Sequence, residues 1–131
     1  MLRRIGAALN NHAPFVFERL HTVPVPARKL FAVVVQQAFH GPIRPKAKGV
    51  ATPPEILEAC GLDVAEFYTL LAALSGAGLI QISNVYPFEE IRLAPEATGA
   101  EALAERCARE KIPFENVFVD LVPLPRENLL G

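Results

Sequence analysis

Three histidines and two cysteines are the residues of this 131-residue chain that most readily bind metals or act as nucleophiles. His12, His21 and His40 share no helical i, i+4 interval with one another and no ligand-like spacing with a cysteine or an aspartate. Cys60 and Cys107 fall on the apolar faces of expected helices, which indicates buried thiols and not a reactive or metal-bound pair. We therefore expect no metal and no cofactor.

Motifs for phosphate or acyl chemistry are also missing from the sequence. The stretch GAG at 76–78 follows an expected helix, whereas a nucleotide-binding glycine loop follows a strand. Ser75 and Ser83 are the two serines of the chain, and neither stands in a nucleophile-elbow motif. Glu89 and Glu90 are neighbours on an expected strand, so their side chains point to opposite faces. The sequence therefore favours a binding protein and not an enzyme.

Basic residues offer a second kind of chemistry, the neutralisation of phosphates. Residues 1–49 hold eight bases and one acid, whereas residues 50–131 hold five bases and thirteen acids. The basic half could meet an anionic partner such as a nucleic acid. The two halves could equally attract each other, within one chain or between two chains. The charge pattern leaves these alternatives open.

Length and composition predict a single globular domain over residues 1–131. Hydrophobic residues make up 51% of the chain and charged residues 21%, which is ordinary for a folded protein. No apolar run approaches the ~18 residues that cross a bilayer, so we expect no membrane partner. The opening MLRRIGAALNNHAP resembles a secretory signal only weakly, because its apolar stretch is short. The expected location is the cytoplasm.

Prolines and glycines divide the chain into expected elements. Alternating or β-branched and aromatic stretches predict strands at 15–23, 79–83, 89–95 and 115–124. For 15–23 a further turn of an N-terminal helix is the alternative, and its residue types favour the strand. Apolar stripes of helical period predict helices at 27–41, 52–61, 63–76 and 98–112. The strands at 79–83 and 89–95 form a hairpin, and the stretch 42–51 between the first two helices is expected to be a basic loop.

Three local signals predict where the two helices in the middle of the chain begin and where the turn between them lies. Thr52 followed by Pro53 and Glu55 is a capping-box pattern that begins one helix. Gly61 permits a sharp turn through a left-handed backbone conformation. Asp63 then caps the next helix. Helix, tight turn and helix are thus expected to follow one another without a gap.

The stretch LDVAEFYTLLAALSGAGLI at 62–80, followed by a hairpin, resembles the L-S-x-x-T-V-x-x-x-L-x-x-L-x-x-x-G-L-I run of bacterial winged-helix regulators. The resemblance covers about residues 26–95. It implies an α+β fold, the winged helix-turn-helix, with a three-helix core plus a β-hairpin wing. Residues 1–25 and 96–131 would be extra flanking elements that could supply a dimer interface.

In family members that bind DNA, the last helix of the core lies in the major groove. The resemblance implies that the outward residues are Val64, Ala65, Glu66, Tyr68, Thr69, Ala72 and Ala73. The residues that could contact DNA are the basic loop and the start of the first core helix, together with two polar groups of the last: Arg28, Lys29, Arg44, Lys46, Lys48, Tyr68 and Thr69. Between 62 and 80, however, the chain has no Lys or Arg, so direct base reading and phosphate contacts lack their usual donors.

Three functions fit these patterns. Family frequency favours a winged-helix DNA-binding transcriptional regulator, expected to be dimeric. The alternative is a degenerate winged-helix module that mediates protein–protein interaction without DNA binding. In that case Tyr86 and Phe88 at the hairpin tip could anchor in a partner, although they could equally pack on the core. The third is a self-associating structural protein joined by its charged halves.

Overall fold

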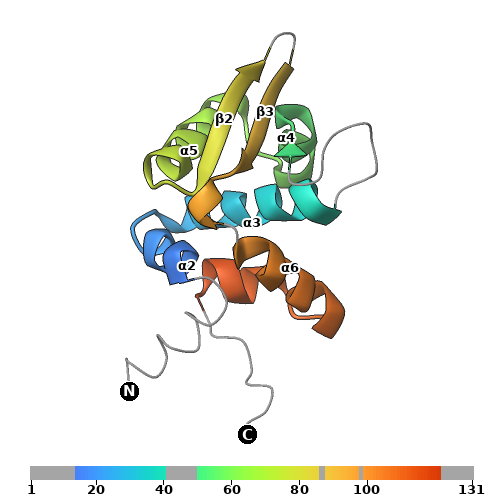
Figure 1. The fold of residues 1–131 in the computed structure, drawn as a ribbon. Coiled ribbons are helices and arrows are strands. Elements are labelled where there is room, and N and C mark those ends of the chain that lie inside the picture. The colour runs from blue at the N-terminus through green and yellow to red at the C-terminus, as the bar shows by residue number, and fades with distance from the viewer. Residues whose placement is uncertain (1–13, 41–49, 86–87, 98, 122–131) are drawn as a thin grey trace, which may run out of the picture.

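The computed structural model describes residues 14–40, 50–85, 88–97 and 99–121, and shows an α+β arrangement of helices around a small antiparallel sheet (Figure 1). Its α-helices are α2 (Pro14–Leu20), α3 (Val25–His40), α4 (Pro53–Cys60), α5 (Val64–Gly76) and α6 (Gly99–Glu110). A 3-10 turn, η1 (Pro95–Ala97), and a π-helical turn, η2 (Glu115–Val119), complete the helical elements described. The strands are β1 (Val50–Ala51), β2 (Ile80–Val85) and β3 (Phe88–Leu93).

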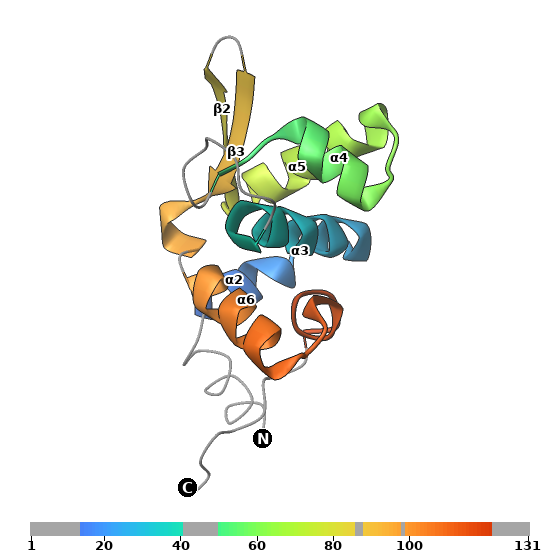
Figure 2. The same cartoon turned by 90° about the vertical axis from the view of Figure 1, so that its right-hand side faces the viewer.

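Helix α3 lies between two layers. Helices α4 and α5 and the β2–β3 hairpin lie on one side of it, and α2, α6 and η2 lie on the other (Figures 1 and 2). The two sides of α3 are therefore both buried, which explains why its apolar residues form so wide a stripe. No helix among the described residues has the length and apolarity that a membrane crossing needs.

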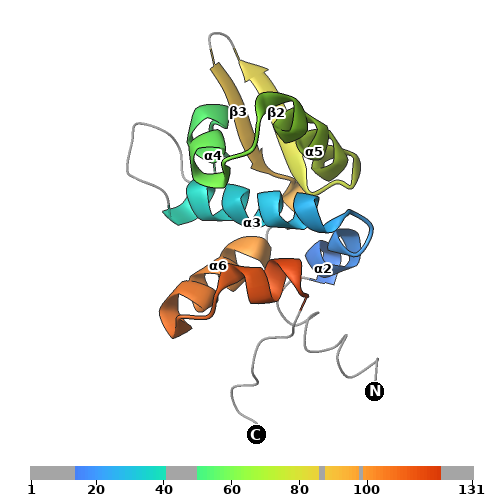
Figure 3. The same cartoon turned by 180° about the vertical axis from the view of Figure 1, so that it is seen from behind.

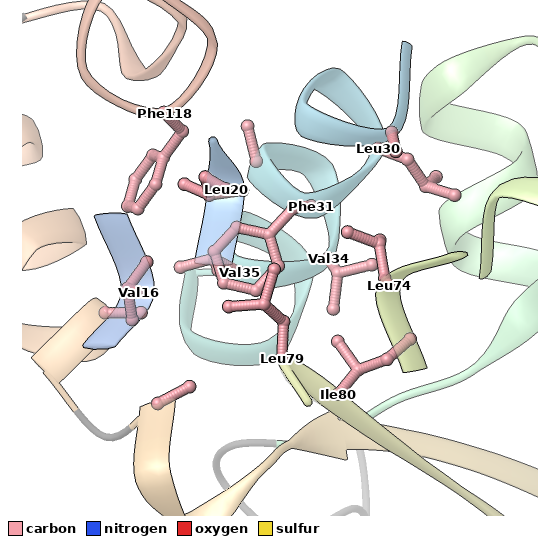
Figure 4. Close-up of a cluster of buried hydrophobic side chains, with 14 of the residues drawn as sticks. Val16, Leu20, Leu30, Phe31, Val34, Val35, Leu74, Leu79, Ile80 and Phe118 are labelled. Atoms are coloured by element: carbon pink, nitrogen blue, oxygen red, sulfur yellow. The ribbon is translucent and has the colours of Figure 1, made fainter. Parts of the chain in front are cut away.

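The hydrophobic core forms where these layers meet α3 (Figure 4). Phe31, Val34 and Val35 of α3 are fully buried between the layers. Fully buried side chains from both sides meet them, among which are Val16, Leu20, Leu74, Leu79 and Phe118. Each such side chain contributes roughly 1.5–3 kcal/mol relative to an exposed one. The flanking elements α2 and η2 are therefore part of the same core as the central helices.

The sheet has the strand order β1-β3-β2, with both pairs antiparallel. Ile80 lies opposite Leu93 and Ile82 opposite Ile91, so these four side chains share one face. Ile80 and Ile91 are buried against the helices, and this face is called the inner face below. The hairpin thus belongs to the core at its base.

Two predicted strands are wrong. Residues 15–23 contain the helix α2, in which Val16, Phe17 and Leu20 occur at helical spacing and are buried. Tertiary burial overrides the β propensity of this stretch. Residues 115–124 contain the π-helical turn η2, in which Asp120 N–H donates to the Glu115 carbonyl at 2.9 Å. Neither place therefore contains a strand among the described residues.

Strand β1 departs from the sequence-based prediction, since its two residues fall within the predicted basic loop 42–51. Val50 lies opposite Arg92 and Ala51 opposite Ile91 of β3, and both residues of β1 are buried. The remainder of that loop lies outside the described residues. A strand of two residues offers too little sequence for an alternating pattern, so no local signal marks it.

The other predicted elements occur in the predicted order, with small shifts of their ends. Helix α3 begins at Val25, and α6 runs from Gly99 to Glu110. Thr52 does occupy the N-cap of α4, but its hydroxyl donates to the Glu55 carboxylate at 3.1 Å and caps no backbone amide. The element order and the pairing of β1 with β3 are consistent with a winged-helix-like layout.

Candidate interaction surface

The turn between α4 and α5 sets the direction of α5. Gly61 ends α4 with φ 72°, a left-handed conformation that glycine adopts without strain, and its N–H donates to the Leu57 carbonyl at 2.9 Å. Asp63 then caps α5, accepting a hydrogen bond from the Glu66 N–H at 2.9 Å. Both predicted turn signals are confirmed, and they fix which side of α5 meets the core.

Helix α5 buries one side and exposes the other. Phe67, Leu70, Leu71 and Leu74 form its buried stripe. The residues exposed on the opposite side are Val64, Ala65, Glu66, Tyr68, Thr69 and Ala72, which we call the α5 face. Six of the seven residues predicted to point outward are thus exposed, and Ala73 is half-buried.

Apolar side chains are prominent on and beside the α5 face. Val64 is 58% exposed and Tyr68 40% exposed. Ile82, on the inner face of β2, is 37% exposed although its neighbour Ile80 is buried. Helices α4 and α5 lie on the same side of the hairpin (Figure 2), and α5 is the one nearer to β2 (Figures 1 and 3). The α5 face and the outer part of β2 therefore form one partly apolar surface.

A hydrogen bond joins the α5 face to the hairpin. The Tyr68 hydroxyl donates to the Glu89 carboxylate of β3 at 3.0 Å, and the Tyr68 ring meets Phe67 edge-on with centroids 5.0 Å apart. Burial raises the pKa of Tyr68, and the hydrogen bond and the charge of Glu89 raise it further. Tyr68 therefore stays a neutral donor, and the hairpin is fixed to α5.

The charges around this surface are mostly negative. Residues 50–93 contain six acids and one base, Arg92. The Arg92 guanidinium is paired with the Glu90 carboxylate at 2.8 Å. Among the described residues, α5 and β2 contribute no Lys or Arg to the surface. These described residues therefore supply none of the unpaired cations that neutralise phosphates in DNA complexes.

Arg28, predicted as a DNA contact, is half-buried inside the fold. Its Nε donates to the Leu20 carbonyl at 2.9 Å and one terminal nitrogen donates to the Val119 carbonyl at 3.2 Å. The side chain thus joins the end of α2, the start of α3 and the end of η2. No local sequence signal could have found this contact, because Val119 is 91 positions away.

The other predicted contacts are scattered. Lys29 is exposed on α3 and lines a cavity together with Leu62 of the α4–α5 turn. Thr69 is on the α5 face, where its hydroxyl donates to the Ala65 carbonyl at 2.9 Å within the helix. Arg44, Lys46, Lys48 and Tyr86, and the side chain of Phe88, lie outside the described residues. Of the predicted contact residues that the structure describes, only Tyr68 and Thr69 lie on the same surface, the α5 face.

The structure also contains a cavity that the sequence did not predict. A space of about 420 Å³ lies between α3, the α4–α5 turn and the start of η2. Leu30, Val33 and Leu62 are among its lining residues. Lys29 and Glu115, which carry opposite charges, are also among its lining residues.

Neither cysteine belongs to a reactive or metal-binding cluster in the described part of the chain. No group of three or more His, Cys, Asp and Glu side chains gathers there. Cys60 is half-buried, with its thiol 3.8 Å from the Leu57 carbonyl. Cys107 is fully buried, and burial raises the pKa of its thiol despite the opposing charge of Arg106. The described thiols are therefore those of small packed side chains.

Comparison of the chain with protein-family models, with curated proteins and with solved structures finds no match in any of the three.

Proposed function

We propose that residues 25–93 form a winged helix-turn-helix domain whose α5 face and hairpin bind a protein partner. Support for the fold comes from the order α3, β1, α4, α5 and hairpin, and from the pairing of β1 with β3. Support for the function comes from one observation. Among the described residues, the surface that a DNA-binding member would place against DNA is apolar and acidic, and Arg92 of β3 is paired with Glu90.

The physical argument rests on desolvation and charge. Val64, Tyr68 and Ile82 lose their contact with water when a protein surface covers them, at roughly 25 cal/mol per Å² of apolar area. Tyrosine, the residue type of Tyr68, is frequent among the residues that dominate binding at protein interfaces, because one end of its side chain is apolar and the other forms hydrogen bonds. The Glu89 contact holds it in place before a partner arrives, which reduces the entropy lost on binding.

The test compares two exposed alanines. Ala72→Arg puts a long charged side chain on the α5 face, whereas Ala102→Arg puts the same side chain on α6, on the opposite side of α3. Neither change affects a buried group, so both variants should unfold within about 0.5 kcal/mol of the original chain. Proteins retained from extracts of the source cells by the original chain and by Ala102→Arg should be lost by Ala72→Arg. An unchanged set with Ala72→Arg would contradict the proposal.

A DNA-binding transcriptional regulator is the second candidate, favoured by the cluster of Arg44, Lys46 and Lys48 just before β1. This function requires that random duplex DNA is retained at a low salt concentration of about 50 mM and released as salt rises. Replacing the three bases with Ala should then reduce the salt dependence of binding. Absence of retention at low salt would exclude this candidate and leave the protein-binding proposal in place.

A further inference from the structure

β2 is one of the two outer strands of the sheet, and its sequence lacks the charges and prolines that commonly protect such an edge. The strand order β1-β3-β2 leaves one side of β2 without a partner strand among the described residues. The sequence of β2, IQISNV, contains no charge and no proline. Proteins commonly protect such an edge with Lys, proline or a bulge, because its unpaired backbone groups can pair with another strand.

The hydrogen-bond pattern between β2 and β3 shows which backbone groups of β2 point to its free edge. The Leu79 carbonyl accepts a hydrogen bond from the Ala94 N–H at 3.0 Å, at the position that continues the β2–β3 register. Hydrogen-bonded and non-hydrogen-bonded pairs alternate in an antiparallel ladder. Gln81 and Ser83 therefore exchange bonds with β3, whereas Ile80, Ile82 and Asn84 direct their N–H and C=O groups to the free edge.

The α5 face lies next to that edge. Helix α5 lies nearer to β2 than to β3 in Figures 1 and 3, and Figure 2 shows that it covers one face of the hairpin at its base. A strand added to β2 would place every second side chain on the inner face of the extended sheet, towards α5. The large exposed apolar side chains of α5 and β2 are Ile82, Tyr68 and Val64. The edge of β2 thus supplies backbone hydrogen-bonding groups, and α5 supplies exposed apolar side chains on which a bound segment can pack.

We infer that an extended segment of the partner protein binds as an added strand on β2 and packs alternate apolar side chains on the α5 face. This inference rests on the function proposed above and specifies how the partner binds. Asp63, Glu66 and Glu89 make the surroundings acidic, and residues 62–85 contain no base. The segment therefore carries Lys or Arg between or beside its apolar residues, because opposite charge favours docking and like charge opposes it.

The experiment begins with a random-peptide display library selected on the full chain. Enriched peptides should alternate apolar residues and include Lys or Arg. Methylating the backbone nitrogens of one enriched peptide, one at a time, should weaken binding at every second position, because alternate amides of an added strand pair with β2. Uniform loss, or no loss, would overturn strand addition. No enrichment of such peptides would overturn it as well.

Two substitutions of Ile82 distinguish the contribution of its backbone N–H to peptide binding from that of its side chain. Ile82→Pro removes an outward N–H while leaving every β2–β3 bond in place, whereas Ile82→Ala keeps that N–H and removes apolar area. Peptide binding should fall at least about tenfold with Ile82→Pro and less with Ile82→Ala. If Ile82→Pro fails to fold, the methylation scan on the unchanged protein tests strand addition by itself.

The two proposals can fail separately. Partner binding that is lost with Ala72→Arg but kept by folded Ile82→Pro would leave the proposed function standing and overturn strand addition. A concentration-dependent dimer of the chain alone, removed by Ile82→Pro, would show that the edge takes up a second copy, and would overturn the assignment to a different protein.

Discussion

The Tyr68 hydroxyl lies 3.0 Å from the Glu89 carboxylate and so connects α5 to β3 across 21 positions of the chain. The contact sets the hairpin against the helix on the surface proposed to bind a partner. α5 and the sheet also share a buried core. This core holds the two side chains in a defined relative position. The surface is thus assembled in the free protein.

We expect Tyr68 to titrate above the ordinary tyrosine pKa of about 10. The cause is first burial, then the hydrogen bond to Glu89, then its charge. A raised pKa means that the folded chain holds the phenol proton more tightly than the unfolded chain. This contribution to stability is therefore complete below pH of about 10 and is lost as pH rises through the folded pKa.

The titration can be read from phenolate absorbance in a Tyr86→Phe background, which leaves Tyr68 as the single tyrosine. Adding Glu89→Gln should lower the pKa of Tyr68, because the nearby carboxylate is removed, but burial should keep it above the ordinary value. A pKa of Tyr68 that does not respond to Glu89→Gln would contradict the hydrogen bond.

Arg28→Ala should destabilise the fold by about 1–3 kcal/mol, because the Leu20 and Val119 carbonyls lose a charged donor. Lys29→Ala is the matched control, since replacing this exposed neighbour should change the free energy of unfolding by no more than about 0.5 kcal/mol. Urea unfolding measures both. Equal effects of the two substitutions would show that the Arg28 contacts contribute nothing specific.

Asp63→Ala should cost about 1 kcal/mol, because the Glu66 N–H at the start of α5 loses its acceptor. Asp63→Asn keeps an oxygen acceptor at the same place and should recover most of that loss. The comparison is made by thermal unfolding at neutral pH. If Asn is as destabilising as Ala, charge and not the cap hydrogen bond stabilises this end of the helix.

The two thiols should react at very different rates with a chromogenic disulfide reagent. Cys60 is half-buried, whereas Cys107 is fully buried and its pKa is raised, so Cys107 has less thiolate and less access. A Cys60→Ser variant of the native protein should show no fast-reacting thiol, and denaturant should expose one. A fast phase that survives Cys60→Ser would show that Cys107 opens readily to solvent.

Local signals in the sequence predicted the turn before α5 and the orientation of that helix. Gly61 and Asp63 mark the turn, and the buried stripe from Phe67 to Leu74 shows which side faces inward. The exposed α5 face follows from that stripe by helical geometry alone. The absence of bases from this face is therefore a property that residue types and helical spacing are enough to predict.

Long-range packing accounts for what the sequence did not predict. Val16, Phe17 and Leu20 form a helix because α3 buries them, whereas their residue types alone favour a strand. Phe118 lies in η2 because its ring packs edge-on against Phe31, with centroids 5.7 Å apart. Partners far along the chain leave no periodic pattern, so neither these elements nor the role of Arg28 could be predicted.

Amide hydrogen exchange should reveal the free edge of β2 in the protein without a partner. Ile82 directs its N–H outward, whereas the Gln81 and Ser83 N–H groups bond to β3. We therefore expect the Ile82 amide to exchange clearly faster than its two neighbours, although the side chains of Ile82 and Gln81 are both exposed. Exchange follows hydrogen bonding of the amide and local opening, so a slow Ile82 amide would mean that another segment already pairs with β2. Nuclear magnetic resonance measures the three rates in one sample, which removes differences of pH and temperature from the comparison.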